Sequence, residues 1–195
     1  MRQSGKRSRE IIEIMADVVA AVSADCRIVV TGYHGEPVEV DCPRINYTFG
    51  NARYVKDRLD ELSSTPTGSD RKFPMIVLFC PFNERRGEPD YYSRADVRVL
   101  IACSTSKLWS NEQRLESSFK SILRPIYRRF IEVLKEDGRF DFGYDDTVQH
   151  EYSENYSYGR YGAYSATGEE VSEPIDAINI TNLRLKVKNQ NCRTR

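Results

Sequence analysis

Nucleophilic catalysis needs a histidine or an equivalent base beside a serine or cysteine. The chain has only two histidines, His34 and His150. His34 lies in a Gly-rich turn sequence and His150 follows a run of acidic residues, so we expect both at the surface. The sequence also has no glycine-rich phosphate-binding pattern and no H-E-x-x-H zinc motif. We therefore predict no catalytic residues and no enzyme activity.

A weak metal-nuclease pattern is the one enzymatic alternative. Asp90 precedes Asp96-Val97-Arg98, and two carboxylates with a following lysine can hold Mg²⁺ and assist an attacking water. Here the gap is short, and Arg98, which cannot lose its proton, stands where the lysine belongs. A charged loop leading into a strand is the favoured interpretation.

The cysteines do not indicate a metal or disulfide framework. They are odd in number, scattered and without C-x-x-C spacing: Cys26, Cys42, Cys80, Cys103 and Cys192. We predict no disulfide, no bound metal and no cofactor.

Tyrosines gather in one irregular, acidic segment, residues 141–176, which holds six of the chain's twelve. The acidic residues there would repel a nucleic-acid backbone, and Arg160 alone would attract it. Tyrosine is enriched in protein interfaces, although packing of the segment on its own domain stays an alternative. We predict an interface formed by Tyr152, Tyr156, Tyr158, Tyr161 and Tyr164, together with Trp109.

Basic side chains gather on the longest expected helix and at the end of the chain. Arg124, Arg128 and Arg129 are candidates for an inter-subunit face or for the lining of a channel. Lys plus Arg equals Asp plus Glu, at 29 each, so any nucleic-acid contact must be local. Separate basic and acidic blocks allow copies to join head to tail, and a solvated helix face explains the same pattern equally well.

A length of 195 residues fits a single domain. No apolar run approaches the ~20 residues of a membrane helix, and no signal peptide is expected. We predict one α+β domain over 1–195, with flexible basic tails at 1–8 and 189–195 and an extended excursion at 141–176. The chain is expected to be made in a cytoplasm and to have no membrane partner.

Apolar spacing predicts the elements of this domain. We expect a helix at 9–24, a hairpin over 27–40, a strand at 45–49 and a helix from Ala52 to Leu62. Buried strands follow at 73–79 and 97–103, then one long helix that continues through Pro125 and ends at Gly138. A last strand changes its apolar phase, which predicts a β-bulge at Thr181–Asn182. The order indicates a mostly antiparallel sheet with helices packed on one face, and a long tyrosine-rich excursion before the last strand.

Four blocks in this order resemble proteins encoded by phages and prophages of the Bacteroides group. They span roughly residues 40–190 and read INYTFG, KFPMIVLF, FKSILRPIY and IDAINITNL. The element order also resembles the tail-terminator, tail-completion and head-to-tail neck ring proteins of tailed phages, which are small α+β subunits.

The resemblance implies a structural virion protein rather than an enzyme. Copies would form a homo-oligomeric ring in the neck or tail, around the channel through which DNA passes. Expected partners are a portal or adaptor on one side and tail tube or hub proteins on the other, with sequence-independent proximity to packaged DNA. Assembly would take place in the cytoplasm of the host bacterium.

Two other hypotheses stay open beside this one. The first is the metal-dependent nuclease that uses Asp90 and Asp96. The second is a mobile-element regulator that binds a host protein through the tyrosine segment.

Overall fold

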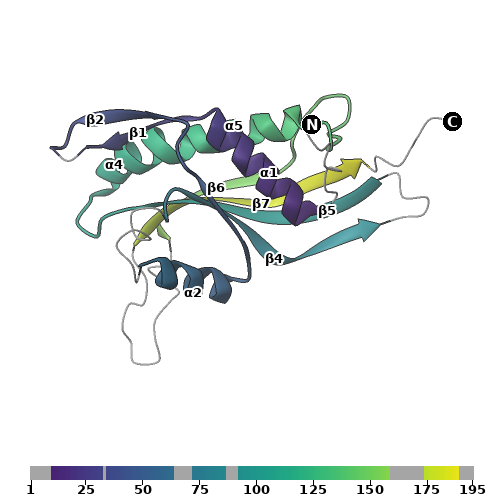
Figure 1. Ribbon diagram of the computed structural model, residues 1–195, viewed down its shortest axis with the longest axis horizontal. Coiled ribbons are helices and arrows are strands. Elements are labelled where there is room, and N and C mark those ends of the chain that lie inside the picture. The colour runs from purple at the N-terminus through teal and green to yellow at the C-terminus, as the bar shows by residue number, and fades with distance from the viewer. Residues whose placement is uncertain (1–9, 33, 64–71, 87–91, 159–173, 189–195) are drawn as a thin grey trace, which may run out of the picture.

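A computed structural model of the chain describes residues 10–32, 34–63, 72–86, 92–158 and 174–188 (Figure 1). The tails predicted at 1–8 and 189–195, and most of the later half of the predicted excursion, lie outside these residues. The described elements are helices and two sheets, which confirms the α+β class.

A five-stranded sheet forms the centre of the molecule, in the order β3-β4-β5-β7-β6. Its strands are β3 (Asn46–Gly50), β4 (Met75–Arg86), β5 (Tyr92–Ser104), β6 (Glu151–Tyr158) and β7 (Ile175–Lys188). Only β3 and β4 run parallel, and the other neighbours are antiparallel. The prediction of a mostly antiparallel sheet is therefore confirmed.

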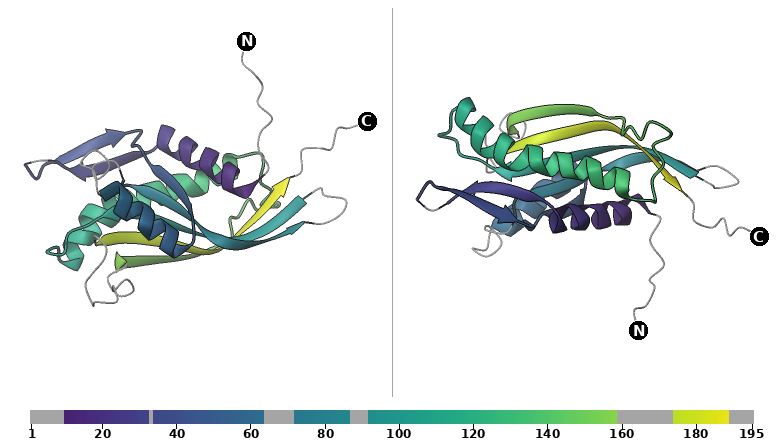
Figure 2. Two further views of the ribbon diagram at one scale, coloured as in Figure 1. Left: turned by 60° about the horizontal axis from the view of Figure 1, so that its bottom comes forward. Right: turned by 90° about the horizontal axis from the view of Figure 1, so that it is seen from above.

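One face of the sheet packs against α1 (Ile11–Ala24) and the long helix, with the hairpin of β1 (Arg27–Thr31) and β2 (Pro37–Asp41) beside them. The apolar stripe of α1 is buried because Ile14, Met15, Val18 and Val22 recur at helical spacing. Phe119 and Phe130 of the long helix are fully buried in the same core. Figure 2 shows the long helix lying over this face of the sheet.

The opposite face carries α2 (Ala52–Ser63), whose Val55 and Leu59 pack on Val77, Leu100 and neighbouring apolar residues. The expectation that all helices share one face is therefore wrong for α2. The reason lies in β4 and β5, where successive residues are buried on both faces of the sheet. Such strands need a cover on each side.

The long helix is continuous from Asn111 to Glu136 and passes through Pro125, as predicted. It begins as α4 (Asn111–Arg114), widens into the π-helix η1 (Leu115–Leu123) and ends as α5 (Arg124–Glu136). In the wide turns, the Arg124 N–H donates to the Phe119 carbonyl five residues back. A proline ring collides with the carbonyl of an ordinary α-helix, and the wider turn gives Pro125 room.

The bulge predicted in the last strand is confirmed. Val97 faces Leu183 and Val99 faces Ile180, so Thr181 and Asn182 together oppose Arg98 alone. Asn182 adopts a left-handed conformation with φ 52°, which asparagine tolerates better than most residues. The extra residue puts Ile180 and Leu183 on the same buried face.

Two strands differ in extent from their predicted bounds. β4 and β5 continue through the polar residues expected to connect them, so the sheet extends well beyond its apolar part. Residues 151–158, expected within an excursion, form the edge strand β6 and pair with β7. β6 is an edge strand and buries only part of its surface, so most of its residues are polar. The alternation of its side chains between the two faces is therefore not visible as an apolar pattern in the sequence.

Candidate functional site

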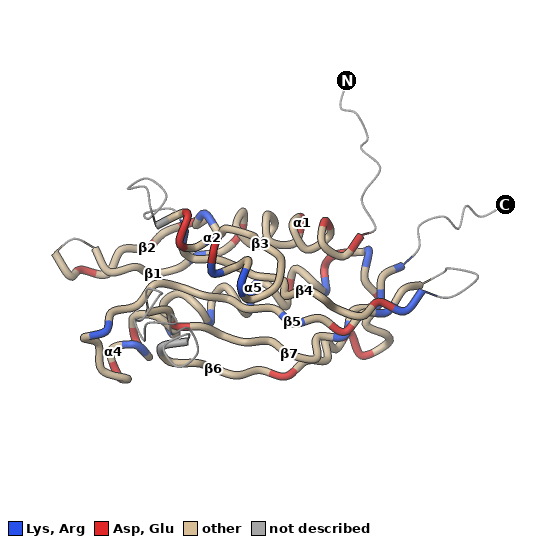
Figure 3. Tube along the Cα trace, turned by 90° about the horizontal axis from the view of Figure 1, so that it is seen from below, with Lys and Arg blue, Asp and Glu red and all other residues tan. Residues whose placement is uncertain are grey.

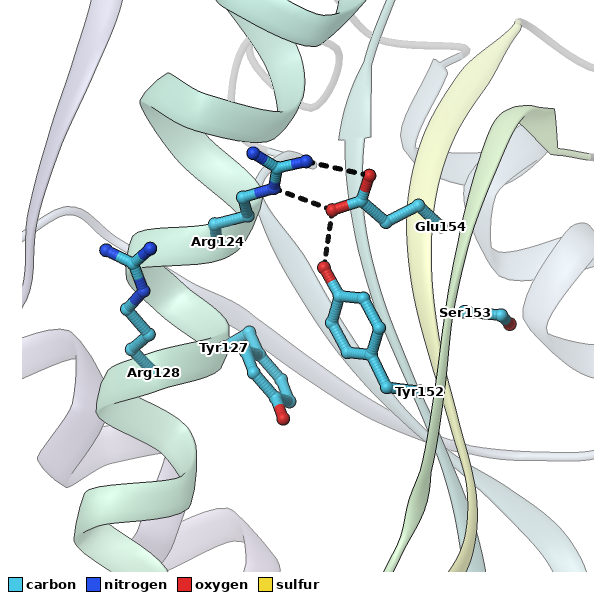
Figure 4. Close-up of a pocket in the computed structure, with 6 residues that line it drawn as sticks. All are labelled: Arg124, Tyr127, Arg128, Tyr152, Ser153 and Glu154. Atoms are coloured by element: carbon cyan, nitrogen blue, oxygen red, sulfur yellow. Dashed lines mark hydrogen bonds and ion pairs between the residues drawn. The ribbon is translucent and has the colours of Figure 1, made fainter.

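An open groove of about 510 Å³ lies between α5 and β6 (Figure 4). We call it the α5–β6 groove, and its lining residues are Arg124, Tyr127, Arg128, Tyr152, Ser153 and Glu154. The first three recur at helical spacing, which brings them to one side of α5. Tyr152 and Glu154 are two residues apart on β6, which turns both toward the helix.

An ion pair joins the two walls of the groove. The Arg124 guanidinium donates from Nε and Nη2 to the two carboxylate oxygens of Glu154, at 2.7 and 3.0 Å. The Tyr152 hydroxyl donates to the same carboxylate. Hydrogen bonds from Arg124 and Tyr152 outweigh partial burial and lower the pKa of Glu154. The carboxylate is therefore charged at neutral pH and holds both partners in place.

Aromatic rings line the part of the groove next to this ion pair. The rings of Tyr127 and Tyr152 lie 4.8 Å apart between centroids, and the Tyr127 hydroxyl lies 2.7 Å from Nε2 of His150. His150 Nδ1 lies 2.8 Å from the Val148 carbonyl, which can only accept. In neutral His150 the proton therefore sits on Nδ1, and Nε2 accepts from Tyr127. Burial raises the pKa of both tyrosines, so they remain neutral donors.

Arg128 is the exposed cation of the groove. No hydrogen bond or ion pair joins it to another residue of the described chain, whereas Arg124 is held by Glu154. The groove thus presents one guanidinium that is already neutralised and one that is available to a partner.

The arrangement suits recognition rather than covalent chemistry. Arginine and tyrosine are the residue types that contribute most to protein interfaces, and Glu154 fixes two of them before any partner arrives. Preorganised side chains lose less conformational entropy on binding. The α5–β6 groove is therefore a candidate docking surface.

The other residues predicted for the interface do not line the α5–β6 groove. Tyr156 is partly buried and packs on Phe119, with 4.3 Å between ring centroids, so it belongs to the core. Trp109 is half-buried, and its carbonyl accepts from Nε of the buried Arg114. The backbone of Tyr158 ends β6. The side chain of Tyr158, and Tyr161 and Tyr164, lie outside the described part of the chain.

Arg129 does not share the groove with Arg124 and Arg128. Its guanidinium forms ion pairs with Asp25, Glu132 and Glu136, at 3.0 to 3.2 Å. The three arginines predicted as one basic face therefore divide into a groove pair and a residue paired near the end of α1.

Of the two aspartates in the metal-nuclease pattern, the structure describes only Asp96. Asp96 is exposed on β5, 3.9 Å from the Arg184 guanidinium, and Asp90 lies outside the described residues. Within the described ranges, no group of three or more His, Cys, Asp or Glu side chains is placed to hold a metal ion. In the same ranges, no helix is both long and apolar enough to cross a membrane.

Three residues that line the groove were missed from the sequence, Tyr127, Ser153 and Glu154, and so was His150, which contacts Tyr127. For the residues on β6, the signal was the alternation of His150, Tyr152, Glu154 and Tyr156, which is typical of a strand. The acidic surroundings favoured an irregular segment instead.

A second exposed surface lies at the other edge of the sheet, and we call it the β3 surface. It has one exposed aromatic residue on each side of the edge strand. Phe49 of β3 lies on the side that α1 covers, next to Tyr47, and Tyr54 belongs to α2 on the opposite side. Their exposed fractions are 45% and 54%. The Tyr54 ring approaches Gly50 so closely that a Cβ there would lie 2.7 Å from it. Gly50, with φ 146°, thus keeps the aromatic ring against the edge strand.

A scan against models of protein families finds no match, and neither does a search among curated proteins.

Proposed function

We propose that the protein is a structural subunit of a tailed phage that associates head to tail into a ring in the neck or at the tail terminus. The observation that carries this proposal is the difference between the two edges of the sheet. Within the described chain β3 pairs only with β4, and β6 pairs only with β7. The β3 surface is aromatic, whereas the α5–β6 groove at the other edge is ionic and aromatic.

Unlike surfaces on opposite edges favour a heterologous contact. In such a contact, one patch of each copy binds a different patch of the next, and the chain of copies closes into a ring when the rotation permits. A twofold dimer would instead use the same patch twice. Arg128 and Tyr152 would act as anchors in the α5–β6 groove, and Phe49 and Tyr54 would supply apolar area at the β3 surface.

The hairpin of β1 and β2 adds to the contact area available to a neighbour. It projects from one end of the molecule (Figure 2), and most of β2 is exposed, including Val38. A projecting hairpin can reach beyond the body of its own subunit, which suits an assembly of repeated copies.

The proposed ring joins a portal or adaptor to tail tube or hub proteins, around the channel that DNA crosses. Its place is the virion, and its assembly takes place in the host bacterial cytoplasm. The resemblance of the four sequence blocks to phage proteins supports this location. The unlike surfaces at the β3 and β6 edges of the sheet support head-to-tail association.

Native mass spectrometry of the concentrated protein, with negative-stain imaging, tests the proposal. We expect closed particles of one copy number. Arg128→Glu should prevent them because it places an anion in the α5–β6 groove beside Glu154. Arg94→Glu, at an exposed position of β5 that belongs to neither the α5–β6 groove nor the β3 surface, is the control and should leave assembly intact. A monomer at every concentration, together with absence from purified virions of the source phage, would contradict the proposal.

A further inference from the structure

The three central strands continue beyond the part of the sheet that α2 covers, and we call this continuation the extension. Beyond the bulges, β4, β5 and β7 pair over Asn83–Arg86, Tyr92–Val97 and Leu183–Lys188. One face of this extension is apolar and buried through Ala95, Val97, Leu183, Leu185 and Val187. The other face continues the one that α2 covers elsewhere, but α2 does not reach it (Figure 1). Its residues are mainly exposed.

Lys and Arg outnumber acidic residues on this exposed face, which we call the cationic face. Figure 3 shows where Lys, Arg, Asp and Glu lie along these strands. The strand register places Arg85 opposite Arg94, and Arg94 opposite Lys186, so that one row of positive charge crosses all three strands. Neighbouring strands lie about 4.8 Å apart, which brings the row within about 10 Å. The complete set is Arg85, Arg94, Arg98, Arg184, Lys186 and Lys188.

The charges of the row are only partly balanced. Lys186 contacts Asp141 at 2.7 Å, and Arg184 lies 3.9 Å from Asp96. Arg85 and Arg94 form no ion pair with any carboxylate of the described residues. Like charges directly opposite each other destabilise a sheet. A polyanion that bridges the row would remove this repulsion.

The composition of the face distinguishes between classes of polyanion. Protein interfaces place aromatic or apolar anchors at their centre and are depleted of charge there. The cationic face exposes one large aromatic residue, Tyr92, and the Lys186 ammonium lies over its ring at 3.9 Å. The Arg98 guanidinium covers the buried ring of Phe79 at 4.0 Å. Single-stranded nucleic acids also need exposed rings on which bases stack. A flat array of guanidinium and ammonium groups instead matches the phosphates of a duplex.

We infer that the cationic face binds the phosphate backbone of double-stranded DNA without sequence preference. Arg85 and Arg94 supply the contacts, because their guanidinium groups have no partner in the described chain. Lys186 adds a third cation to the row and retains its ion pair with Asp141. This binding goes beyond subunit association and does not depend on it, because the face lies apart from the α5–β6 groove and the β3 surface.

Fluorescence anisotropy of a labelled, random-sequence DNA duplex tests the inference with the full chain. Wild-type protein is titrated between about 50 and 200 mM salt, where phosphate contacts are strongly salt-dependent. Arg85→Gln and Arg94→Gln should each weaken binding roughly tenfold. The double variant should lower the slope of log affinity against log salt by about two.

The matched control removes the same charge elsewhere. Arg27→Gln with Lys120→Gln alters two exposed cations, on the hairpin and on the helix side of the molecule. It should bind DNA within about twofold of wild type, because neither position belongs to the cationic face. Circular dichroism and native mass of each variant separate lost binding from lost folding or assembly.

Three results would overturn the inference. The first is no DNA binding by the wild-type protein at the lowest salt. The second is equal binding by the Arg85/Arg94 double variant and the control. The third is displacement of DNA by unlabelled polyglutamate at equal charge, which would assign the face to an acidic protein. Each of these leaves the ring proposal standing, because particle formation is measured separately.

Discussion

At the scale of single residues, Glu154 organises the α5–β6 groove through its charge. Hydrogen bonds from Arg124 and Tyr152 lower its pKa below the ordinary value of 4.5. A lowered folded-state pKa stabilises the protein above the unfolded pKa, and this contribution is lost as the pH falls through the folded value. Glu154→Gln should therefore lower the free energy of unfolding by about 1 kcal/mol near pH 7.

The difference between wild type and Glu154→Gln should shrink as the pH falls below the ordinary glutamate value, because protonated Glu154 resembles glutamine. Urea denaturation across that pH window measures it. Glu132→Gln removes an exposed partner of Arg129 and should cost only a few tenths of a kcal/mol. A Glu154→Gln difference that stays constant with pH would mean that the carboxylate charge does not hold the groove together.

At the scale of elements, the bulge in β7 decides which side chains are buried. Deleting Asn182 would move Leu183, Leu185 and Val187 to the exposed face, because side chains alternate with period two. We expect the deletion to abolish cooperative unfolding. Asn182→Gly keeps the residue count and tolerates the left-handed backbone, so it should stay within about 1 kcal/mol of wild type.

Asn182→Val lies between these two cases. A β-branched residue at positive φ costs about 1–2 kcal/mol, and the register is kept. Urea denaturation followed by near-ultraviolet circular dichroism ranks the three variants. A folded deletion variant with wild-type stability would show that β7 can pair in another register.

The strands β7 and β6 show which parts of this structure the sequence predicts and which it does not. The bulge was predictable because Ile178, Ile180, Leu183 and Leu185 are apolar in two phases that one extra residue reconciles. The strand β6 was not predicted, because its alternating Tyr152 and Glu154 stand among acidic residues that favour an irregular segment. The groove was missed with it, since half of its residues lie on that strand.

Other differences arise from contacts that no local pattern encodes. The long helix was predicted through Pro125, but the apolar spacing did not predict the π turns of η1. α2 was predicted as a helix, yet its side of the sheet depends on β4 and β5 being buried on both faces. The cationic face needs the strand register, because Lys186 is far in the sequence from Arg85 and Arg94 and meets them only where β5 pairs with β7.

At the scale of the whole molecule, a head-to-tail contact makes a prediction that a twofold contact does not. Each copy has two different patches, so a variant with one damaged patch keeps the other intact. Arg128→Glu damages the α5–β6 groove, and Phe49→Asp damages the exposed aromatic edge at β3. Each variant alone should be monomeric, because every contact it could form includes one damaged patch.

Mixing equal amounts of the two variants should restore one contact. The intact β3 surface of Arg128→Glu meets the intact groove of Phe49→Asp, and the damaged patches lie at the outer ends of the pair. Native mass spectrometry should therefore detect heterodimers and no larger particles. In a twofold assembly that uses the groove twice, Phe49→Asp alone would already dimerise and mixing would add nothing. That result would replace the ring by an isologous dimer, because it would show that one patch suffices for association.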